Sequence, residues 1–293
     1  MMTLSASTWI LDPLTPKTPY DLKAGLDRLK AAGFSFVDFN LWNFSHVGMP
    51  LAADNWQAWV AEMREHCEKI GLRVRQTHGA TVNGKHWDEP QGEAVAHMNE
   101  MNYRCVEATK ALGAEVIVLH PFNLPRDPIY SREKAKKAAI ENISPYLELA
   151  KRLGIEIAVE NMVDYGGRRR RYCGGDPDEL IDLVDSFKDE ALGMCIDTGH
   201  AHNSGIYVPD FIRLAGKRLK ATHVDDNLAD KDTHLPPFMG TVNWQDTMAA
   251  LREIGYTGDF SFEIGPQQYP QQSPARDTWY RYIYSLGADL LAL

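Results

Sequence analysis

The chain has 293 residues, of which 44% are hydrophobic and 24% charged, and it carries a formal net charge of −9 at pH 7. This composition is typical of a globular protein with an ample core, and the negative charge disfavours a broad nucleic-acid surface because it repels polyanions at long range. No apolar run reaches the about 18 residues that cross a bilayer, and the first residues lack the basic and apolar regions of a signal peptide.

Short apolar runs alternate with longer amphipathic stretches along the whole chain. The apolar runs predict strands over 3–10, 36–41, 73–78, 115–120, 155–160, 192–197, 219–223 and 261–264. Apolar residues at helical spacing predict helices over 21–32, 55–70, 93–112, 131–153, 177–186, 209–215, 244–254 and 277–291. Pro145 lies inside the fourth of these helices, where it predicts a kink or a break.

These eight strand–helix units run through residues 1–293 without a long linker or a low-complexity segment. Strands that alternate with helices favour a parallel sheet, and eight such units favour a closed (β/α)8 TIM barrel. A doubly wound open sheet is the alternative, but it more often carries a glycine fingerprint after its first strand, which this chain lacks. We therefore predict an α/β protein with one barrel domain.

Metal-ligand residue types close almost every predicted strand. In order along the chain, these strand ends carry Asn40, His78, His120, Glu160, Asn161, Asp197, His223 and Glu263. The active site of such a barrel lies at the carboxyl ends of its strands, so we expect these side chains to meet on one rim. Packing does not explain so many charged groups in one place, because unpaired buried charges are costly. The set therefore predicts a functional site.

Three carboxylates and one imidazole stand out among these residues. They belong to Glu160, Asp197, His223 and Glu263. This mixture suits one divalent ion such as Mn²⁺, Mg²⁺ or Co²⁺ in octahedral geometry, with two positions left for substrate oxygens. Further donors nearby would either bind substrate or extend the metal site. If they all ligate, the site becomes rich enough in histidine for Zn²⁺ and for more than one ion. These further donors are His78, His120, His200, Asp232 and His234.

Four motifs carry a resemblance to a known family. They are VEN at 159–161, CIDTGHAH at 195–202, THVDDNLADKDTHLPPFMGTVNW at 222–244 and FEIG at 262–265. Together they resemble the xylose isomerase-like TIM barrel superfamily, and most of all its sugar phosphate isomerase/epimerase group. The match covers nearly the whole chain in order.

The resemblance implies a site and a reaction. In the ketose 3-epimerases of that superfamily, a single divalent metal is held at the positions of Glu160, Asp197, His223 and Glu263, and the two glutamates act as base and acid on opposite faces of the sugar. The chemistry is sound in itself, because a metal that bridges a carbonyl and the adjacent hydroxyl stabilises the enediolate formed when the carbon-bound proton leaves. We therefore expect a metal-dependent isomerase or epimerase that acts on a small sugar, a sugar phosphate or another sugar derivative.

Three other functions are kept as alternatives. The superfamily includes endonuclease IV, a trinuclear zinc phosphodiesterase for abasic DNA. Its ligand types find counterparts at His78, His120, Glu160, Asp197, His200, His223, Asp232, His234 and Glu263. The acidic charge and the absence of a basic stripe disfavour DNA, as does LPPFMGTVNW after His234, where that group has a glycine-flanked acid. A lyase or dehydratase would use the same proton abstraction, and a non-catalytic barrel would only bind sugar.

The remaining expectations concern single segments and the environment. Arg168–Arg171 either clamp a substrate anion or form a solvated loop, and the loop is slightly favoured. Trp9, Asn40, Trp42 and Phe122 either bind a sugar or pack. The four cysteines show no CxxC spacing, which indicates reduced thiols and a cytoplasmic protein. A homo-oligomer is compatible with the sequence, which does not identify the sugar, the metal or the oligomeric state.

Overall fold

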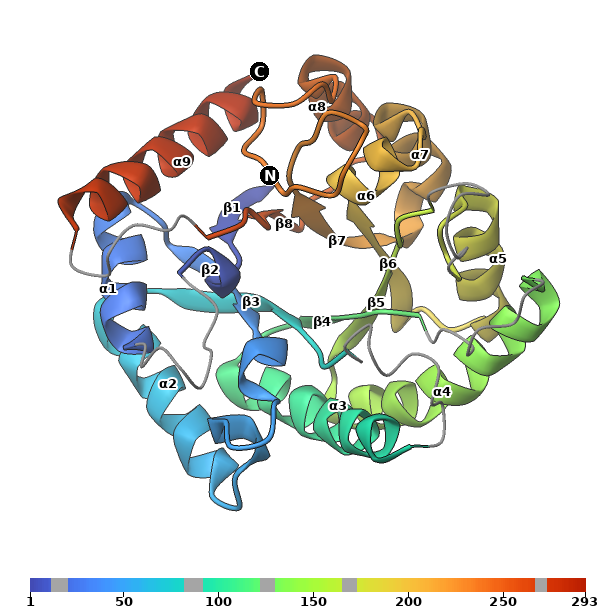
Figure 1. The fold of residues 1–293 in the computed structure, drawn as a ribbon, viewed down its shortest axis with the longest axis horizontal. Helices are drawn as coiled ribbons and strands as arrows, with labels where there is room; N and C mark the ends of the chain where they lie inside the picture. Colours follow the sequence, from blue (N-terminus) through green and yellow to red (C-terminus); the bar gives the residue numbers. More distant parts are fainter. Residues whose placement is uncertain (12–20, 82–91, 122–129, 165–172, 267–272) are drawn as a thin grey trace.

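A computed structural model describes residues 1–11, 21–81, 92–121, 130–164, 173–266 and 273–293 (Figure 1). Its strands are β1 Thr3–Ala6, β2 Phe36–Asn40, β3 Arg73–His78, β4 Val116–Leu119, β5 Glu156–Glu160, β6 Leu192–Asp197, β7 Leu219–Val224 and β8 Asp259–Phe262. They form one parallel sheet in the order β1-β8-β7-β6-β5-β4-β3-β2, and a parallel bridge between Ser7 and Asp38 joins its two ends. The predicted TIM barrel is confirmed.

Helices surround the sheet in Figure 1 and cover its outer face. They are α1 Leu22–Ala32, α2 Trp56–Ile70, α3 Glu93–Leu112, α4 Arg132–Leu153, α5 Pro177–Phe187, α6 Thr198–Asn203, α7 Val208–Ala215, α8 Trp244–Glu253 and α9 Pro274–Ala292. Short 3-10 helices are η1 Thr8–Leu11, η2 Leu41–Phe44, η3 Pro50–Ala52 and η4 Gly216–Arg218. No helix in these described ranges is both long and apolar enough to cross a bilayer.

The structure corrects the predicted elements at three places. The strand predicted over 3–10 ends at Ala6, because the Ser7 carbonyl and hydroxyl accept hydrogen bonds from the backbone of Ile10 and Trp9 and so begin η1. Helix α4 runs without a break through Pro145, since residues on both sides of the proline are buried against the same core. Strand β8 ends at Phe262, so Glu263 follows the strand instead of lying within it.

The core has two parts, one inside the barrel and one between the sheet and the helices. Small apolar side chains fill part of the interior, where Val116, Val118, Ala158, Cys195 and Ala221 are buried. The larger part lies under the helices and includes Phe34, Phe39, Phe211 and Phe260. Buried polar side chains at the carboxyl ends of the strands include His78, Glu160, Asp197 and His223. This is the end of the barrel where chemistry is expected.

Asp259 is a charged residue buried near the opposite, amino end of the barrel. Only 3% of the residue is exposed, and burial raises the pKa of its carboxyl from 3.8 to about 7 although Arg75 opposes the shift. An aspartate with a raised folded pKa favours the folded state below that pKa, and this stabilisation is lost as the pH rises from about 4 to about 7. Ionised Asp259 therefore makes the fold less stable above neutral pH.

Replacing Asp259 by asparagine is expected to remove this pH dependence. Relative to the wild type, the D259N chain should gain free energy of unfolding between pH 5 and pH 8, by at most about 4 kcal/mol for a shift of this size. Urea denaturation at the two pH values measures the difference. Equal differences between variant and wild type at both pH values would show that Asp259 does not ionise in this range.

Candidate metal centre and active site

The side chain of Glu160 lies where several strands converge at the carboxyl end of the barrel. It ends β5 and is 1% exposed. Its Oε1 lies 2.9 Å from His223 Nδ1, and its Oε2 lies 3.0 Å from His120 Nε2 and 3.3 Å from His78 Nε2. One carboxylate from β5 thus contacts imidazoles carried by β3, by the segment after β4 and by β7.

The four predicted ligands form a compact buried group. One donor atom from each of Glu160, Asp197, His223 and Glu263 lies within 4.8 Å of the others. Two ligands at about 2.1 Å on opposite sides of one ion are roughly 4 Å apart, so a small contraction would bring all four into coordination distance. Asp197 Oδ2 is buried with no hydrogen-bond donor among the described residues. An oxygen in that position is costly unless a cation compensates it, so the residues fit a divalent ion.

The two glutamates of this group are pushed toward opposite protonation states. Although burial opposes it, the imidazoles of His223 and His120 hold the pKa of Glu160 well below its usual range. Burial raises the pKa of Glu263, and the nearby Glu160 carboxylate adds to this while His223 opposes it. Paired carboxyls with pKa values shifted in opposite directions are typical of acid–base sites.

A second group of donors lies beside the first and contains His200, Asp232 and His234. His200 Nδ1 donates to the Asn161 carbonyl at 2.8 Å, and His234 Nδ1 donates to the Glu263 carbonyl at 2.9 Å. Because a carbonyl only accepts, each Nδ1 carries a proton and each Nε2 faces the Asp232 carboxylate. These Nε2 atoms lie 3.2 Å and 3.5 Å from Asp232 Oδ2. Backbone carbonyls orient metal-binding histidines in this way.

His78 and His120 lie on the other side of Glu160. His78 Nδ1 donates to the Gly79 carbonyl at 2.8 Å, which leaves Nε2 toward Glu160. His120 Nδ1 lies 3.2 Å from the Thr81 hydroxyl. The structure therefore brings all the predicted site residues to one rim. Their roles as ligands, acids and bases stay predictions.

Sequence reasoning left Asp225 out of the candidate site. It is fully buried, neither carboxylate oxygen has a hydrogen-bond donor among the described residues, and Oδ2 lies 3.6 Å from His234 Nδ1. Burial, with Asp197 nearby, raises its pKa well above the usual range. The signal was its spacing, because a residue two positions after His223 along an extended chain points to the same side.

The aromatic residues that the sequence placed near the rim differ in whether they border the site. Trp9 packs edge-on against His234 with ring centroids 4.8 Å apart, so it borders the site. Trp42 packs against His46 instead, at 5.4 Å. Phe122 and Arg168–Arg171 lie outside the described residues.

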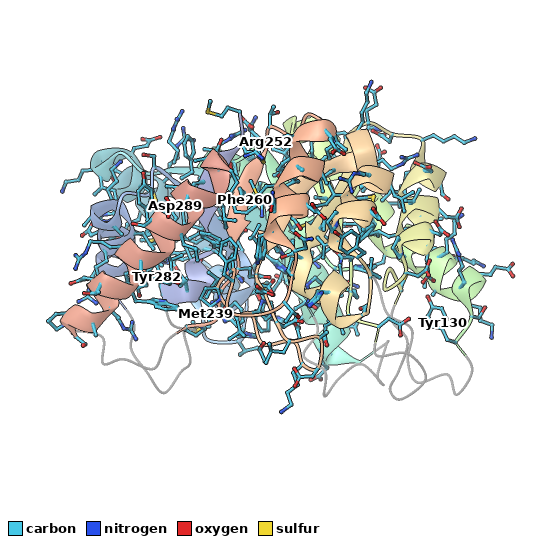
Figure 2. The ribbon with its side chains drawn as sticks, turned by 90° about the horizontal axis from the view of Figure 1, so that it is seen from above. Tyr130, Met239, Arg252, Phe260, Tyr282 and Asp289 are labelled. Atoms are coloured by element: carbon cyan, nitrogen blue, oxygen red, sulfur yellow. The ribbon has the colours of Figure 1, made fainter. Side chains whose placement is uncertain are left out.

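A long segment, 225–243, leaves the carboxyl end of β7 and supplies Asp225, Asp232 and His234 to the site. Figure 2 shows Met239 of this segment at one end of the barrel and Arg252, near the end of α8, at the other. Asp226 holds the segment in place, since its carboxylate accepts hydrogen bonds from the backbone of Phe238 and Val242 and from the Trp244 indole. The site is therefore built partly on a loop that is tied to the barrel.

Gly199, near the start of α6, is required by the packing beneath this loop. A Cβ at this position would lie 1.8 Å from Asp225 Oδ1. Replacing Gly199 by alanine is expected to lower the free energy of unfolding by about 1–3 kcal/mol, because the buried carboxylate has to move. Thermal denaturation measures the loss, and Gly265→Ala is the control, since its Cβ would meet its nearest atoms at 3.9 Å. Equal stability of the two variants would contradict the expectation.

A model of the family described as "Xylose isomerase-like TIM barrel" matches residues 26–281. The chain belongs to this family. The family resemblance predicted from the four sequence motifs is thereby confirmed.

Curated relatives with different activities match the chain. The inosose isomerase of Bacillus subtilis is 24% identical over 172 residues, which cover 56% of this chain and 59% of that protein. A protein named "Probable endonuclease 4" from Geobacillus sp. is 32% identical over 185 residues, covering 59% and 57%. The D-psicose 3-epimerase of Enterocloster bolteae is 22% identical over 241 residues, covering 81% and 75%. The chain thus spans less than two thirds of the length of the first two.

Solved structures match over nearly the full chain. A D-tagatose 3-epimerase-like protein superposes with a TM-score of 0.75 at 18% identity, covering 99% of this chain and 98% of that one. An L-ribulose 3-epimerase gives a TM-score of 0.76 at 15% identity, covering 100% and 95%. The IOLI protein "with a binding zinc atom" gives 0.73 at 15%, covering 99% and 98%. At these identities the similarity shows the fold alone.

Proposed function

We propose that this protein is a divalent-metal-dependent isomerase or epimerase of a sugar or sugar derivative that works by proton transfer next to a carbonyl. The observation that carries the proposal is the pair of buried glutamates, Glu160 and Glu263, which both approach His223 and have pKa values shifted in opposite directions. The isomerase and epimerase relatives support the reaction class.

Each of the four residues would have a defined role in metal binding or proton transfer. Glu160, Asp197, His223 and Glu263 would hold one Mn²⁺, Mg²⁺ or Co²⁺, or a Zn²⁺ in their place. The bound ion would supply positive charge that stabilises an oxyanion developing beside the reacting carbon. Glu160 would take the carbon-bound proton, and Glu263 would return one. Asp197 and His223 would act only as ligands.

The surrounding donors would bind the substrate. His78, His120, His200, Asp232 and His234 present imidazole and carboxylate groups around the ligand set, which suits the hydroxyls of a small sugar.

Deuterium exchange tests the reaction class. Protein purified without chelators and supplied with Mn²⁺ is incubated in D₂O with a panel of ketoses, aldoses and their phosphates, and NMR detects deuterium on the carbon next to the carbonyl together with any new isomer. Exchange with isomer formation supports the proposal. Exchange followed by loss of a leaving group would identify a lyase or dehydratase, and binding without exchange would identify a non-catalytic barrel.

A phosphodiesterase is the second candidate, because one specific observation favours it. The Nε2 atoms of His78 and His120 face Glu160, while those of His200 and His234 face Asp232, so the structure holds donors for more than one ion. Metal analysis distinguishes the candidates: one Mn, Mg or Co ion per chain supports the isomerase, and three Zn ions support the endonuclease-like enzyme. The latter would also cleave an abasic duplex and bind it with steep salt dependence.

A further inference from the structure

We propose that Asp38 is a positioning residue for the metal centre, whose carboxylate holds His223 with Nδ1 turned toward the ligand group. The inference rests on the metal centre of the proposed function and is independent of which substrate the protein uses. Among the described residues, Asp38 belongs to none of the groups of candidate metal ligands.

The two ring nitrogens of His223 face different carboxylates. Nδ1 lies 2.9 Å from Glu160 Oε1 and 3.3 Å from Glu263 Oε2, on the side of the ligand group. Nε2 lies 3.4 Å from Asp38 Oδ2, and both residues are fully buried. A nitrogen that ligates a metal cannot carry a proton. If Nδ1 is the ligand, the ring proton is therefore on Nε2 and points at Asp38.

The Asp38 carboxylate is itself fixed by side chains from two other strands. Its Oδ2 accepts a hydrogen bond from Gln76 Nε2 at 2.7 Å and one from the Ser261 hydroxyl at 3.1 Å. Asp38, Gln76 and Ser261 come from β2, β3 and β8, which lie next to the seam where the bridge between Ser7 and Asp38 closes the barrel. The carboxylate thus cannot move away from the imidazole without breaking these bonds.

Charge explains why this carboxylate is matched to His223. Within the described part of the chain, His223 is the group that forms an ion pair with Asp38, and no lysine or arginine is recorded within 4.0 Å of it. A fully buried carboxylate needs hydrogen-bond donors or a nearby positive charge. When the His223 ring binds a cation through Nδ1, its Nε2–H is a donor to Asp38 and the ring carries part of the positive charge of the cation. The 3.4 Å separation exceeds that of a formed hydrogen bond, so we expect it to shorten when the ion binds. Such a carboxylate also raises the basicity of the ligand nitrogen.

The test compares Asp38→Asn with wild type and with Asp259→Asn. Both substitutions change a buried aspartate of the same barrel to a neutral residue of the same shape, but Asp259 lies near the amino end, where it pairs with Arg75. Calorimetric titration with Zn²⁺ is expected to show affinity about 10–100-fold weaker for D38N. D259N should bind as the wild type does. The stability of each variant, measured separately, shows whether weaker binding merely follows from a weaker fold.

Nitrogen-15 NMR of the histidine rings in the Zn²⁺-loaded protein reads the tautomer directly. In the wild type, His223 should carry its proton on Nε2 and the metal on Nδ1, and D38N should alter the Nε2–H resonance. Affinity of D38N within twofold of wild type, metal at Nε2 of His223, or a wild type that binds no ion at this residue would overturn the inference. If D38N fails to fold, the wild-type spectrum still shows which ring nitrogen of His223 binds the metal, and so still tests the inference. A protein that shows the expected tautomer but exchanges no deuterium into any sugar would refute the proposed function and leave this inference intact.

Discussion

Replacing Glu160 by glutamine should lower kcat of the sugar reaction by about 10³-fold, within the range of roughly 10²–10⁴ that a positioned acid or base contributes. The amide keeps the shape of the side chain but cannot accept the carbon-bound proton. It also removes the negative charge that contacts His78, His120 and His223. The measurement is the rate of deuterium incorporation together with isomer formation at saturating metal and substrate.

A matched control lies on the same strand. Glu156 begins β5 and Glu160 ends it, but Glu156 pairs with Lys220 at the amino end of the barrel, far from the ligand group. Glu156→Gln should therefore change kcat by less than about twofold, since partly exposed ion pairs contribute little. Retention of more than a tenth of the activity by Glu160→Gln, with metal bound, would exclude Glu160 as the base.

Removal of the metal is the second change with a large expected effect. After chelation, activity should fall to background and return with Mn²⁺, Co²⁺ or Mg²⁺, because the ion neutralises carboxylates that are buried together. A ligand at about 100 times its Kd stabilises the folded state by about 2.7 kcal/mol, and a chain of this size gains roughly 2–4 °C in Tm per kcal/mol. The Tm should therefore rise by about 5–10 °C when the ion is restored.

Asp197→Asn provides the control for this effect. Asp197 is fully buried, and its Oδ2 has no donor among the described residues, so a cation would compensate this oxygen. In this variant, added metal should shift the Tm by much less than in the wild type. Scanning calorimetry with and without the ion measures both shifts. Full activity and an unchanged Tm in protein shown by elemental analysis to be free of metal would rule out the metal centre.

The sequence by itself determined the barrel and the composition of the rim. Apolar runs that alternate with amphipathic stretches encode strands and helices locally, and the residues that close those runs, such as Glu160 and Asp197, could be named because strand ends meet on one face. It did not reveal α6, which is too short to show a period, or the early end of β1, which a hydrogen bond to Ser7 imposes.

Only the tertiary structure decided which atoms meet. Asp38 has no local pattern that separates it from other aspartates, and the spacing of Asp225 from His223 indicates only the side to which it points. The role of each depends on a partner that the fold brings close: His234 for Asp225 and His223 for Asp38. The same holds for the ring nitrogens, since backbone carbonyls of Asn161 and Glu263 fix which nitrogen of His200 and His234 faces the site. The physical reason is that hydrophobic patterning acts over a few residues, whereas these distances depend on the register and closure of the whole barrel.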